Sequence, residues 1–206
     1  MKEANGYLFP DEEEHMFNWV KERGGYQTEK QETAFALCKK RGVAIDIGAH
    51  VGTWARPMKD IFHTVVCFEP VFHEYLAKNV PGAIIHKLAL SDKHEYLKFT
   101  PGENSTGDTH VGKRFKEPVE GAVEATTLDA FGYRPDFIKI DCEGFEYFVI
   151  KGGEKMIKES NPVMVVEQKP KHAERFGLKQ RDAIDLLESW GAKVVVEYSG
   201  DFFLRW

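Results

Sequence analysis

The sequence predicts an α/β protein whose mostly parallel sheet carries helices on both faces. Short apolar runs, such as Val43-Ala44-Ile45-Asp46-Ile47, predict buried strands, and they alternate with segments of helical period, such as 180–190. Strands that alternate with helices pair in parallel, because each helix returns the chain to the same end of the sheet. Near the C-terminus, the turn at Ser199-Gly200-Asp201 between two apolar runs predicts an antiparallel hairpin.

The expected elements follow one another in a regular order. Residues 12–22 and 28–40 are expected to form two helices ahead of the alternating pattern. The expected strands are 43–47, 64–68, 83–86, 96–100, 123–128, 137–141, 163–167, 193–198 and 202–206, and the helices among them are 53–61, 72–79, 145–157 and 180–190. We therefore divide the chain into a helical N-terminal extension or lid, 1–42, and one domain, 43–206. The aperiodic segment 101–117 is expected to be a functional or mobile loop.

Composition limits the class of protein. The chain has 206 residues, of which 42% are hydrophobic and 30% charged, and this excludes a disordered or fibrous chain. Its net charge of −5 argues against DNA as a partner. Cys38, Cys67 and Cys142 lack the spacing of a zinc site, so we expect free thiols. Because the sequence shows neither a signal peptide nor a transmembrane stretch, we expect a cytoplasmic protein without a membrane partner.

The turn after the first strand of the domain is the first candidate for a binding site. Gly48 and Gly52 remove side chains where a backbone would approach a ligand, and the following helix offers unpaired N–H groups. Glu69 ends the next strand, 21 positions after Gly48, where a carboxylate can accept hydrogen bonds from both hydroxyls of a ribose. Such an arrangement can bind a nicotinamide dinucleotide or an adenosyl cofactor.

Two details favour the adenosyl cofactor. The glycine spacing is G-x-x-x-G, whereas a pyrophosphate is held by G-x-G-x-x-G. Asp46, just before the turn, would repel a diphosphate and suits the ammonium and sulfonium groups of S-adenosylmethionine. The residues also leave open a structural role, in which the Asp46 carboxylate accepts hydrogen bonds from the glycine turn.

Carboxylates gather at later strand ends as well. Asp141 and Glu143 flank the end of a strand, where desolvating a carboxylate is costly unless it has a partner. Glu146 would open the next helix, where the helix dipole favours a negative charge. Glu167 ends the following strand, and His172 lies in the loop after it. Because ligands of parallel sheets bind beyond the carboxyl ends of the strands, we expect these side chains near one cleft.

These motifs, in this order, resemble the FkbM family of S-adenosylmethionine-dependent methyltransferases. The matching segments are 45–52, 67–70, 88–92, 127–129, 138–146, 150–152 and 162–167. One departure is His50, which stands where the family often has asparagine. Residues 1–42 and 101–122 match no motif, and they are the regions expected to select the substrate.

The resemblance implies a Rossmann-like sheet of seven strands whose last strand is antiparallel. It also implies a place for each part of the cofactor. Asp46, Gly48 and His50 would line its methionine side, and Gly52 of the same turn is a further candidate contact of the cofactor. Glu69 would hold the ribose, and Ser91-Asp92 would lie near the adenine.

For the reaction, the resemblance implies that Asp141 faces the methyl group and Glu143 the substrate. The family is mostly associated with O-methylation of sugars and natural products, so the expected acceptor is a hydroxyl of a sugar or another small molecule. Asp141, Glu143 and His172 are the candidate bases, and a carboxylate is favoured. A divalent metal held by Asp141, Glu143 and Glu167 suits hard oxygen ligands but is not predicted.

Three other functions remain open at this point. They are a nicotinamide-dependent oxidoreductase, a non-catalytic module that binds the cofactor, and an RNA ribose methyltransferase. Amino-methylating enzymes of nucleic acids carry an Asn/Asp-Pro-Pro-aromatic loop after the fourth strand, whereas this chain has Asp141-Cys142-Glu143-Gly144 there. No feature of the sequence predicts an oligomeric state.

Overall fold

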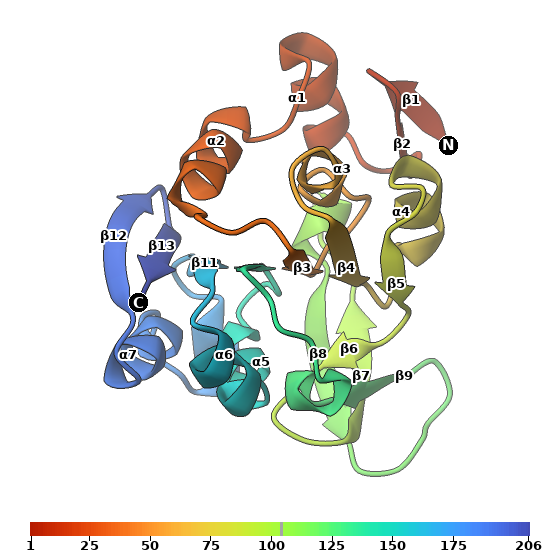
Figure 1. The fold of residues 1–206 in the computed structure, drawn as a ribbon. Coiled ribbons are helices and arrows are strands. Elements are labelled where there is room, and N and C mark those ends of the chain that lie inside the picture. Colours follow the sequence, from red (N-terminus) through yellow and green to blue (C-terminus); the bar gives the residue numbers. More distant parts are fainter. Residues whose placement is uncertain (104) are drawn as a thin grey trace.

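A mixed seven-stranded sheet runs through the centre of the protein (Figure 1). The structure, a computed structural model, describes residues 1–103 and 105–206. The strands follow the order β12-β13-β11-β10-β3-β4-β5 across the sheet. Their bounds are β3 (Val43–Ile47), β4 (Thr64–Phe68), β5 (Ile84–His86), β10 (Phe137–Ile140), β11 (Val163–Glu167), β12 (Lys193–Tyr198) and β13 (Asp201–Arg205). The α/β class and the seven strands are confirmed.

The sheet is mixed, and this corrects the prediction of a mostly parallel one. β11, β10, β3, β4 and β5 pair in parallel. β13 lies between β11 and β12 and is antiparallel to both. The C-terminal hairpin is therefore part of the sheet itself, and it adds two antiparallel pairings to the parallel ones.

Helices cover both faces of this sheet (Figure 1). On one face lie α2 (Thr28–Leu37) and α3 (Ala55–Lys59); on the other lie α5 (Glu146–Lys151), α6 (Glu154–Ser160) and α7 (Asp182–Ser189). Successive side chains of a strand point to opposite faces, so Ile45 and Ile47 join the core under α5–α7, while Ala44 joins the core under α2 and α3. The expected helix 145–157 is divided into α5 and α6 at Gly152-Gly153. The backbone at Gly152 also packs closely against Ser91, since a β-carbon there would lie 2.0 Å from the Ser91 carbonyl oxygen.

A second, four-stranded sheet lies beside β4 and β5 (Figure 1) and has the order β6-β9-β7-β8. Its strands are β6 (Ala89–Leu90), β7 (Glu95–Thr100), β8 (His110–Phe115) and β9 (Val123–Thr126). The segment 101–117, expected as an aperiodic loop, contains the short helix η1 (Thr106–Asp108) and the whole of β8. β8 escaped prediction because it is an edge strand, paired only with β7, in which Val111 alone is buried.

The N-terminal segment contains a strand pair besides the expected helices. β1 (Lys2–Ala4) and β2 (Tyr7–Phe9) precede α1 (His15–Arg23) and pack beside α4 (His73–Asn79). The Asn79 amide donates to the carbonyl oxygens of Leu8 and Val51, and this fixes the segment to the turn after β3. Within the described residues, no helix combines the length and the apolar character needed to cross a membrane.

The turns after β3 and β10 touch at Gly48. This residue has a φ of 75°, and a β-carbon on it would lie 1.9 Å from the carbonyl oxygen of Asp141. Gly132, just after the short helix η2 (Leu128–Phe131), has a similar φ of 65°, but a β-carbon there would meet nothing within 4 Å. The two glycines therefore separate the cost of a positive φ from the cost of a close approach.

We predict that Gly48→Ala lowers the free energy of unfolding by about 3 kcal/mol or more. Gly132→Ala should cost only about 1–2 kcal/mol, the price of a left-handed backbone for an L residue. Urea unfolding followed by circular dichroism measures both. Equal losses would show that the approach of the two turns does not require glycine at position 48.

Candidate active site

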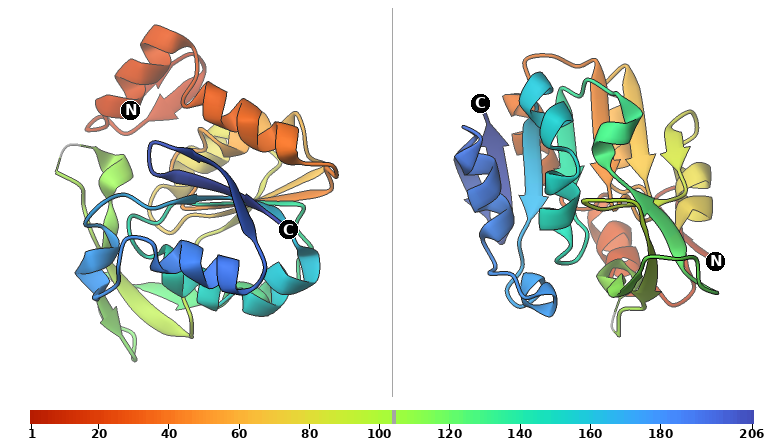
Figure 2. Two further views of the ribbon diagram at one scale, coloured as in Figure 1. Left: turned by 90° about the vertical axis from the view of Figure 1, so that its left-hand side faces the viewer. Right: turned by 90° about the horizontal axis from the view of Figure 1, so that it is seen from below.

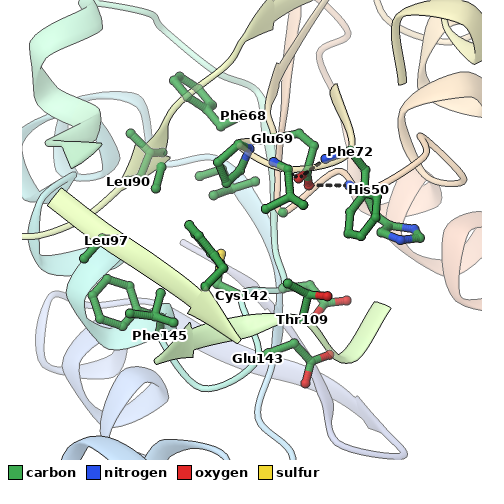
Figure 3. Close-up of a pocket in the computed structure, with 18 of the residues that line it drawn as sticks. His50, Phe68, Glu69, Phe72, Leu90, Leu97, Thr109, Cys142, Glu143 and Phe145 are labelled. Carbon is green, nitrogen blue, oxygen red and sulfur yellow. Dashed lines mark hydrogen bonds between the residues drawn. The ribbon is translucent and has the colours of Figure 1, made fainter. Parts of the chain in front are cut away.

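The loops that follow β3, β4, β10 and β11 meet at one edge of the sheet and border two adjoining cavities. The first is lined largely by apolar side chains such as Phe68, Leu90 and Phe145 (Figure 3), and we name it the apolar cavity. The second is lined by charged side chains that include Lys139 and Glu167, and we name it the polar cavity. Residues that line both cavities are Gly48, His50, Gly107, Asp141 and Glu143.

Glu69 is held rigidly on the wall of the apolar cavity (Figure 3). Its Oε1 accepts hydrogen bonds from the backbone N–H groups of Val71 (2.8 Å) and Phe72 (2.9 Å), and its Oε2 accepts from the N–H of His50 (2.8 Å). A carboxylate oxygen has two lone pairs, so Oε2 can accept one further hydrogen bond. Glu69 therefore fits the sequence-based prediction of a ribose ligand.

His50 links the turn after β3 to the second sheet. Its Nε2 lies 2.9 Å from the Thr106 hydroxyl, and its ring lies 4.5 Å from the ring of Phe72. Burial lowers the pKa of His50, so the neutral ring is favoured. Its Nδ1 is buried and has no hydrogen-bond partner among the residues that the structure describes. The imidazole thus brings an unused polar atom to the boundary of the two cavities.

Asp46 lies behind the wall of the site. It is completely buried, and neither carboxylate oxygen has a hydrogen-bond partner in the described part of the chain. Lys139, its neighbour on β10, places Nζ 4.0 Å from Asp46 Oδ1 and 3.0 Å from Asp141 Oδ2. Asp46 is not among the described residues that line either cavity. Its charge therefore reaches the site through Lys139 rather than by direct contact.

Asp141, Glu143, Glu167 and His172 come together as the sequence predicted, with Lys169 among them. Lys169 Nζ lies 2.8 Å from Glu167 Oε1 and 3.5 Å from Glu143 Oε1, and His172 Nδ1 lies 2.8 Å from Glu143 Oε2. Against the effect of burial, the Lys139 ammonium holds the pKa of Asp141 below its ordinary value. Burial and the adjacent Asp141 carboxylate raise the pKa of Glu167 well above its ordinary value.

Glu146 shapes the loop that carries these groups. Its Oε1 accepts from the N–H groups of Cys142 (2.8 Å) and Gly144 (3.0 Å), and its Oε2 accepts from Gln168 Nε2 (3.0 Å). The loop also needs Gly144, because a β-carbon there would lie 2.4 Å from the His172 carbonyl. Glu146 thus joins the loops after β10 and β11, a role beyond the favourable helix start that the sequence predicted.

Ser91 and Asp92 have a different setting from the one the resemblance implies. The Ser91 hydroxyl donates to Glu95, and Arg114 pairs with Asp92 (2.9 Å) and Glu95 (2.6 Å). Neither Ser91 nor Asp92 is among the described residues that line the apolar cavity. In this structure they join β6 to β8, and their contact with adenine stays a prediction.

Gly52 serves packing rather than the cavities. Its φ is 93°, and a β-carbon on it would lie 2.5 Å from Val80 Cγ2 and 2.8 Å from Leu76 Cδ1. It is not one of the described residues that line the apolar or the polar cavity. The glycine therefore allows the turn after β3 to approach α4, and the predicted contact of Gly52 with the cofactor stays a prediction.

Sequence reasoning missed Glu13, which closes the site from the N-terminal side. Its Oε2 accepts from the Ser105 hydroxyl (2.7 Å) and from the N–H and hydroxyl of Thr106 (2.7 and 2.6 Å). Its Oε1 accepts from the N–H of Met16 (2.8 Å). Figure 2 shows the N-terminal segment and the 105–108 segment on the same side of the sheet. An acidic run at positions 12–14 gave no sign that its middle residue would be fully buried.

Comparison with a family model identifies the domain. Residues 46–194 match the model of the methyltransferase FkbM domain, which is well over half of the chain. The chain belongs to the FkbM methyltransferase family. The resemblance indicated by the motifs is thereby confirmed, and the oxidoreductase that the glycine turn alone left open has no support. No curated protein sequence matches the chain significantly.

Solved structures share the fold. A methyltransferase FkbM from Methylobacillus flagellatus aligns with a TM-score of 0.51 and 18% identity over 82% of this chain; the chain spans only 44% of its length. A precorrin-6y C5,15-methyltransferase from Geobacter metallireducens has a TM-score of 0.50 and 14% identity, covering 86% of this chain and 87% of its own. A TehB-like SAM-dependent methyltransferase from Corynebacterium glutamicum has a TM-score of 0.50 and 11% identity, covering 92% and 96%. At these identities the likeness concerns the fold alone.

The buried charge of Asp46 predicts a pH dependence of stability. Burial raises the pKa of Asp46 to about 6 in the folded protein, although the charge of Lys139 opposes this effect. Because the folded pKa lies above the unfolded one, ionisation of Asp46 removes stability as the pH rises from about 4 through about 6. We expect the free energy of unfolding of the wild type, relative to Asp46→Asn, to fall over this range.

Urea unfolding of both proteins at about pH 4.5 and about pH 7 measures this difference. Groups that titrate equally in the two proteins cancel, and Lys139 keeps Asp141 as its partner in the variant. A difference that stays constant or rises with pH contradicts the assignment of the raised pKa to Asp46.

The Glu13 contacts predict the mobility of the segment that covers the site. Glu13→Gln removes the negative charge that accepts from the Thr106 N–H, and charge-assisted hydrogen bonds contribute ~1.5–3 kcal/mol each. Hydrogen exchange at the Thr106 amide should therefore become roughly 10–100-fold faster. Glu12→Gln, on an exposed neighbour, is the matched control and should leave the exchange rate unchanged. Equal exchange rates at Thr106 in all three proteins would show that Glu13 does not hold this segment in place.

Proposed function

We propose that the protein transfers the methyl group of S-adenosylmethionine to a hydroxyl of a small molecule, such as a sugar. The observation that carries the proposal is the Glu69 carboxylate, fixed at the end of β4 on the wall of an apolar cavity, in a chain of the FkbM methyltransferase family. A pre-positioned carboxylate beside an apolar cavity suits an adenosine, because the base needs apolar contacts and the ribose needs a hydrogen-bond acceptor.

The cofactor fits the described residues from one end to the other. The apolar cavity offers Phe68, Leu90 and Phe145 to the adenine, and Glu69 Oε2 offers its remaining lone pair to a ribose hydroxyl. Gly48 and His50 border both cavities and would meet the methionine part. The N–H of His50 already donates to Glu69, and those of Gly48 and Ala49 donate to the Phe68 carbonyl, so a diphosphate would find few donors at this turn.

The charge of the polar cavity also suits this cofactor. Asp141, Glu143 and Glu167 stand against the ammonium groups of Lys139 and Lys169, which leaves carboxylates in excess. Within a partly desolvated site, such an excess favours a ligand of positive charge. S-adenosylmethionine, when bound, supplies an activated methyl group to the acceptor oxygen and leaves as S-adenosylhomocysteine.

The acceptor has a route from the surface to the polar cavity. A surface groove, which we name the outer groove, is lined by Trp19, Tyr26 and Tyr198, and it shares Glu167 and Lys169 with the polar cavity. Aromatic side chains with polar neighbours suit the flat faces and hydroxyls of a sugar. Because the groove is built from residues 15–30 and 167–199, the N-terminal extension takes part in selecting the acceptor.

Glu143 and His172 are the groups placed to accept the proton of the acceptor hydroxyl. Their side chains lie 2.8 Å apart, so the carboxylate can stabilise the imidazolium that forms. Asp141 is a weaker base, because the Lys139 ammonium holds its pKa below the ordinary value. General-base assistance of this kind contributes roughly 10²–10⁴-fold, and the alignment of the two reactants contributes ~7–11 kcal/mol at best.

The proposal extends to the setting of the protein. Cys38, Cys67 and Cys142 are free thiols, and the first two are buried. Free thiols persist in a reducing compartment, so we place the protein in the cytoplasm. Its acceptor is then a cytoplasmic metabolite or natural-product intermediate.

Calorimetric titration with S-adenosylhomocysteine tests the cofactor. We expect binding to the wild type, roughly tenfold weaker binding to Glu69→Gln, and unchanged binding to Glu74→Gln, an exposed glutamate on α4. Titration with NAD is the comparison for the oxidoreductase. If the protein binds NAD and does not bind S-adenosylhomocysteine, the proposal is contradicted.

The transfer itself is measured by release of S-adenosylhomocysteine in the presence of sugars, nucleosides or phenols. With an accepted substrate, His172→Ala should lower kcat more than it raises KM, because the base acts in the transition state. Cofactor binding without turnover on any acceptor would instead assign the protein to a non-catalytic role.

A further inference from the structure

We propose that Glu143, Glu167 and His172 bind a divalent metal ion at the junction of the polar cavity and the outer groove. Glu167 lies on the walls of both spaces, and Glu143 lines the polar cavity. The three side chains come from the loop after β10, the end of β11 and the loop after β11. The tertiary fold alone brings them together.

The ligand atoms of the three side chains converge. One oxygen of each glutamate and one ring nitrogen of His172 all lie within 4.8 Å of one another. Donor atoms that share one ion at bond lengths of about 2.0–2.2 Å are themselves roughly 3–4.4 Å apart. Small side-chain rotations therefore suffice to bring all three onto one ion.

Two of these atoms have no hydrogen-bond partner in the part of the chain that the structure describes. Glu143 is 95% buried, and its Oε2 has no hydrogen-bond partner among the described residues, nor does Nδ1 of His172. The two atoms lie 2.8 Å apart, yet they are not aligned for a hydrogen bond with each other. Two buried lone-pair donors this close together, without a hydrogen bond to satisfy either, can be satisfied as ligands of a third atom.

The charges around this point favour a cation. Lys169 Nζ already approaches both Glu167 and Glu143, which marks the place where the two carboxylates attract positive charge. Its side chain is 41% exposed and can turn into the outer groove. The remaining ammonium group, Lys139, is shared by Asp141 and Asp46, so it does not neutralise the glutamates.

The donor set selects the kind of ion. Two carboxylates with one imidazole suit Mn²⁺ or Zn²⁺, whereas Mg²⁺ prefers oxygen ligands alone. This set of ligands differs from the three carboxylates, those of Asp141, Glu143 and Glu167, that the sequence alone suggested for a metal. Asp141 is already paired with Lys139 at 3.0 Å, and His172 is the third ligand instead of Asp141.

An ion at this point would have a role in the reaction, and that role rests on the proposed function. It would face the route by which the acceptor reaches the polar cavity. A bound divalent cation lowers the pKa of a coordinated hydroxyl and orients it, so in the metal-bound protein the ion would activate the acceptor hydroxyl in place of the Glu143–His172 pair. The binding of the ion, however, is tested without cofactor or acceptor.

The test is a titration of the full chain, freed of metal with EDTA, with MnCl2. Free Mn²⁺ is followed by its electron paramagnetic resonance signal. We expect one saturable site per chain, weakened about tenfold or more in Glu143→Gln and in His172→Ala, which corresponds to ~1.4 kcal/mol or more. Lys169→Met should tighten binding by about tenfold, because it removes a competing positive charge.

Glu174→Gln is the matched control, since Glu174 is exposed and only two positions from His172. It should bind Mn²⁺ like the wild type. Circular dichroism shows whether each variant is folded. His172 lies in a partly exposed loop, so His172→Ala should fold. If Glu143→Gln does not fold, His172→Ala alone tests the metal site. Absence of a saturable site overturns the proposal, as does a site that His172→Ala and Lys169→Met leave unchanged. Either outcome leaves the S-adenosylhomocysteine titration, and with it the proposed function, untouched.

Discussion

One buried ammonium group, that of Lys139, makes the arrangement of the site possible. β3 and β10 run side by side, and each carries a carboxylate near its end, Asp46 and Asp141. A buried charge without a partner costs several kcal/mol, and two neighbouring carboxylates add their repulsion. Lys139 stands in register with Asp46 and donates to Asp141 at 3.0 Å. Its positive charge therefore offsets both the cost of burial and the repulsion between the two carboxylates. The turns at Gly48 and Asp141 can then approach closely, and the two cavities open beside them.

The two cavities divide the site by chemistry. The apolar cavity carries one fixed carboxylate, Glu69, whose three backbone donors hold it at the wall. The polar cavity carries carboxylates in excess of ammonium groups and opens toward the outer groove. Under the proposed function, the first would hold the adenosine and the second the cationic centre beside the acceptor. Glu13 and Glu146 are not among the described residues that line either cavity; they hold the loops, through Thr106 on one side and Gln168 on the other.

The centre of the sheet was predictable, because β3, β4, β10 and β11 are short apolar runs with both faces buried. The position of Glu69 at the site was predictable for a related reason. It follows directly after the strand that comes next after the glycine turn, and the carboxyl ends of parallel strands lie at one edge of a sheet. β8 was not, since an edge strand with one buried side chain carries almost no apolar pattern. Nor were the partners of Ser91 and Asp92, because the Arg114 that engages Asp92 comes from β8, which pairs across the second sheet.

The sequence by itself determined the class of fold, the family motifs and the set of polar residues at the strand ends. Local pattern suffices for these, because they depend on spacing along the chain. The tertiary structure alone decided which of those residues line the two cavities. It turned Asp46 behind Lys139, gave Gly52 to the packing of α4, and brought His172 onto Glu143. The physical reason is that burial and charge pairing arise between segments that are distant in sequence, as the contact of Glu13 with the 105–107 segment also shows.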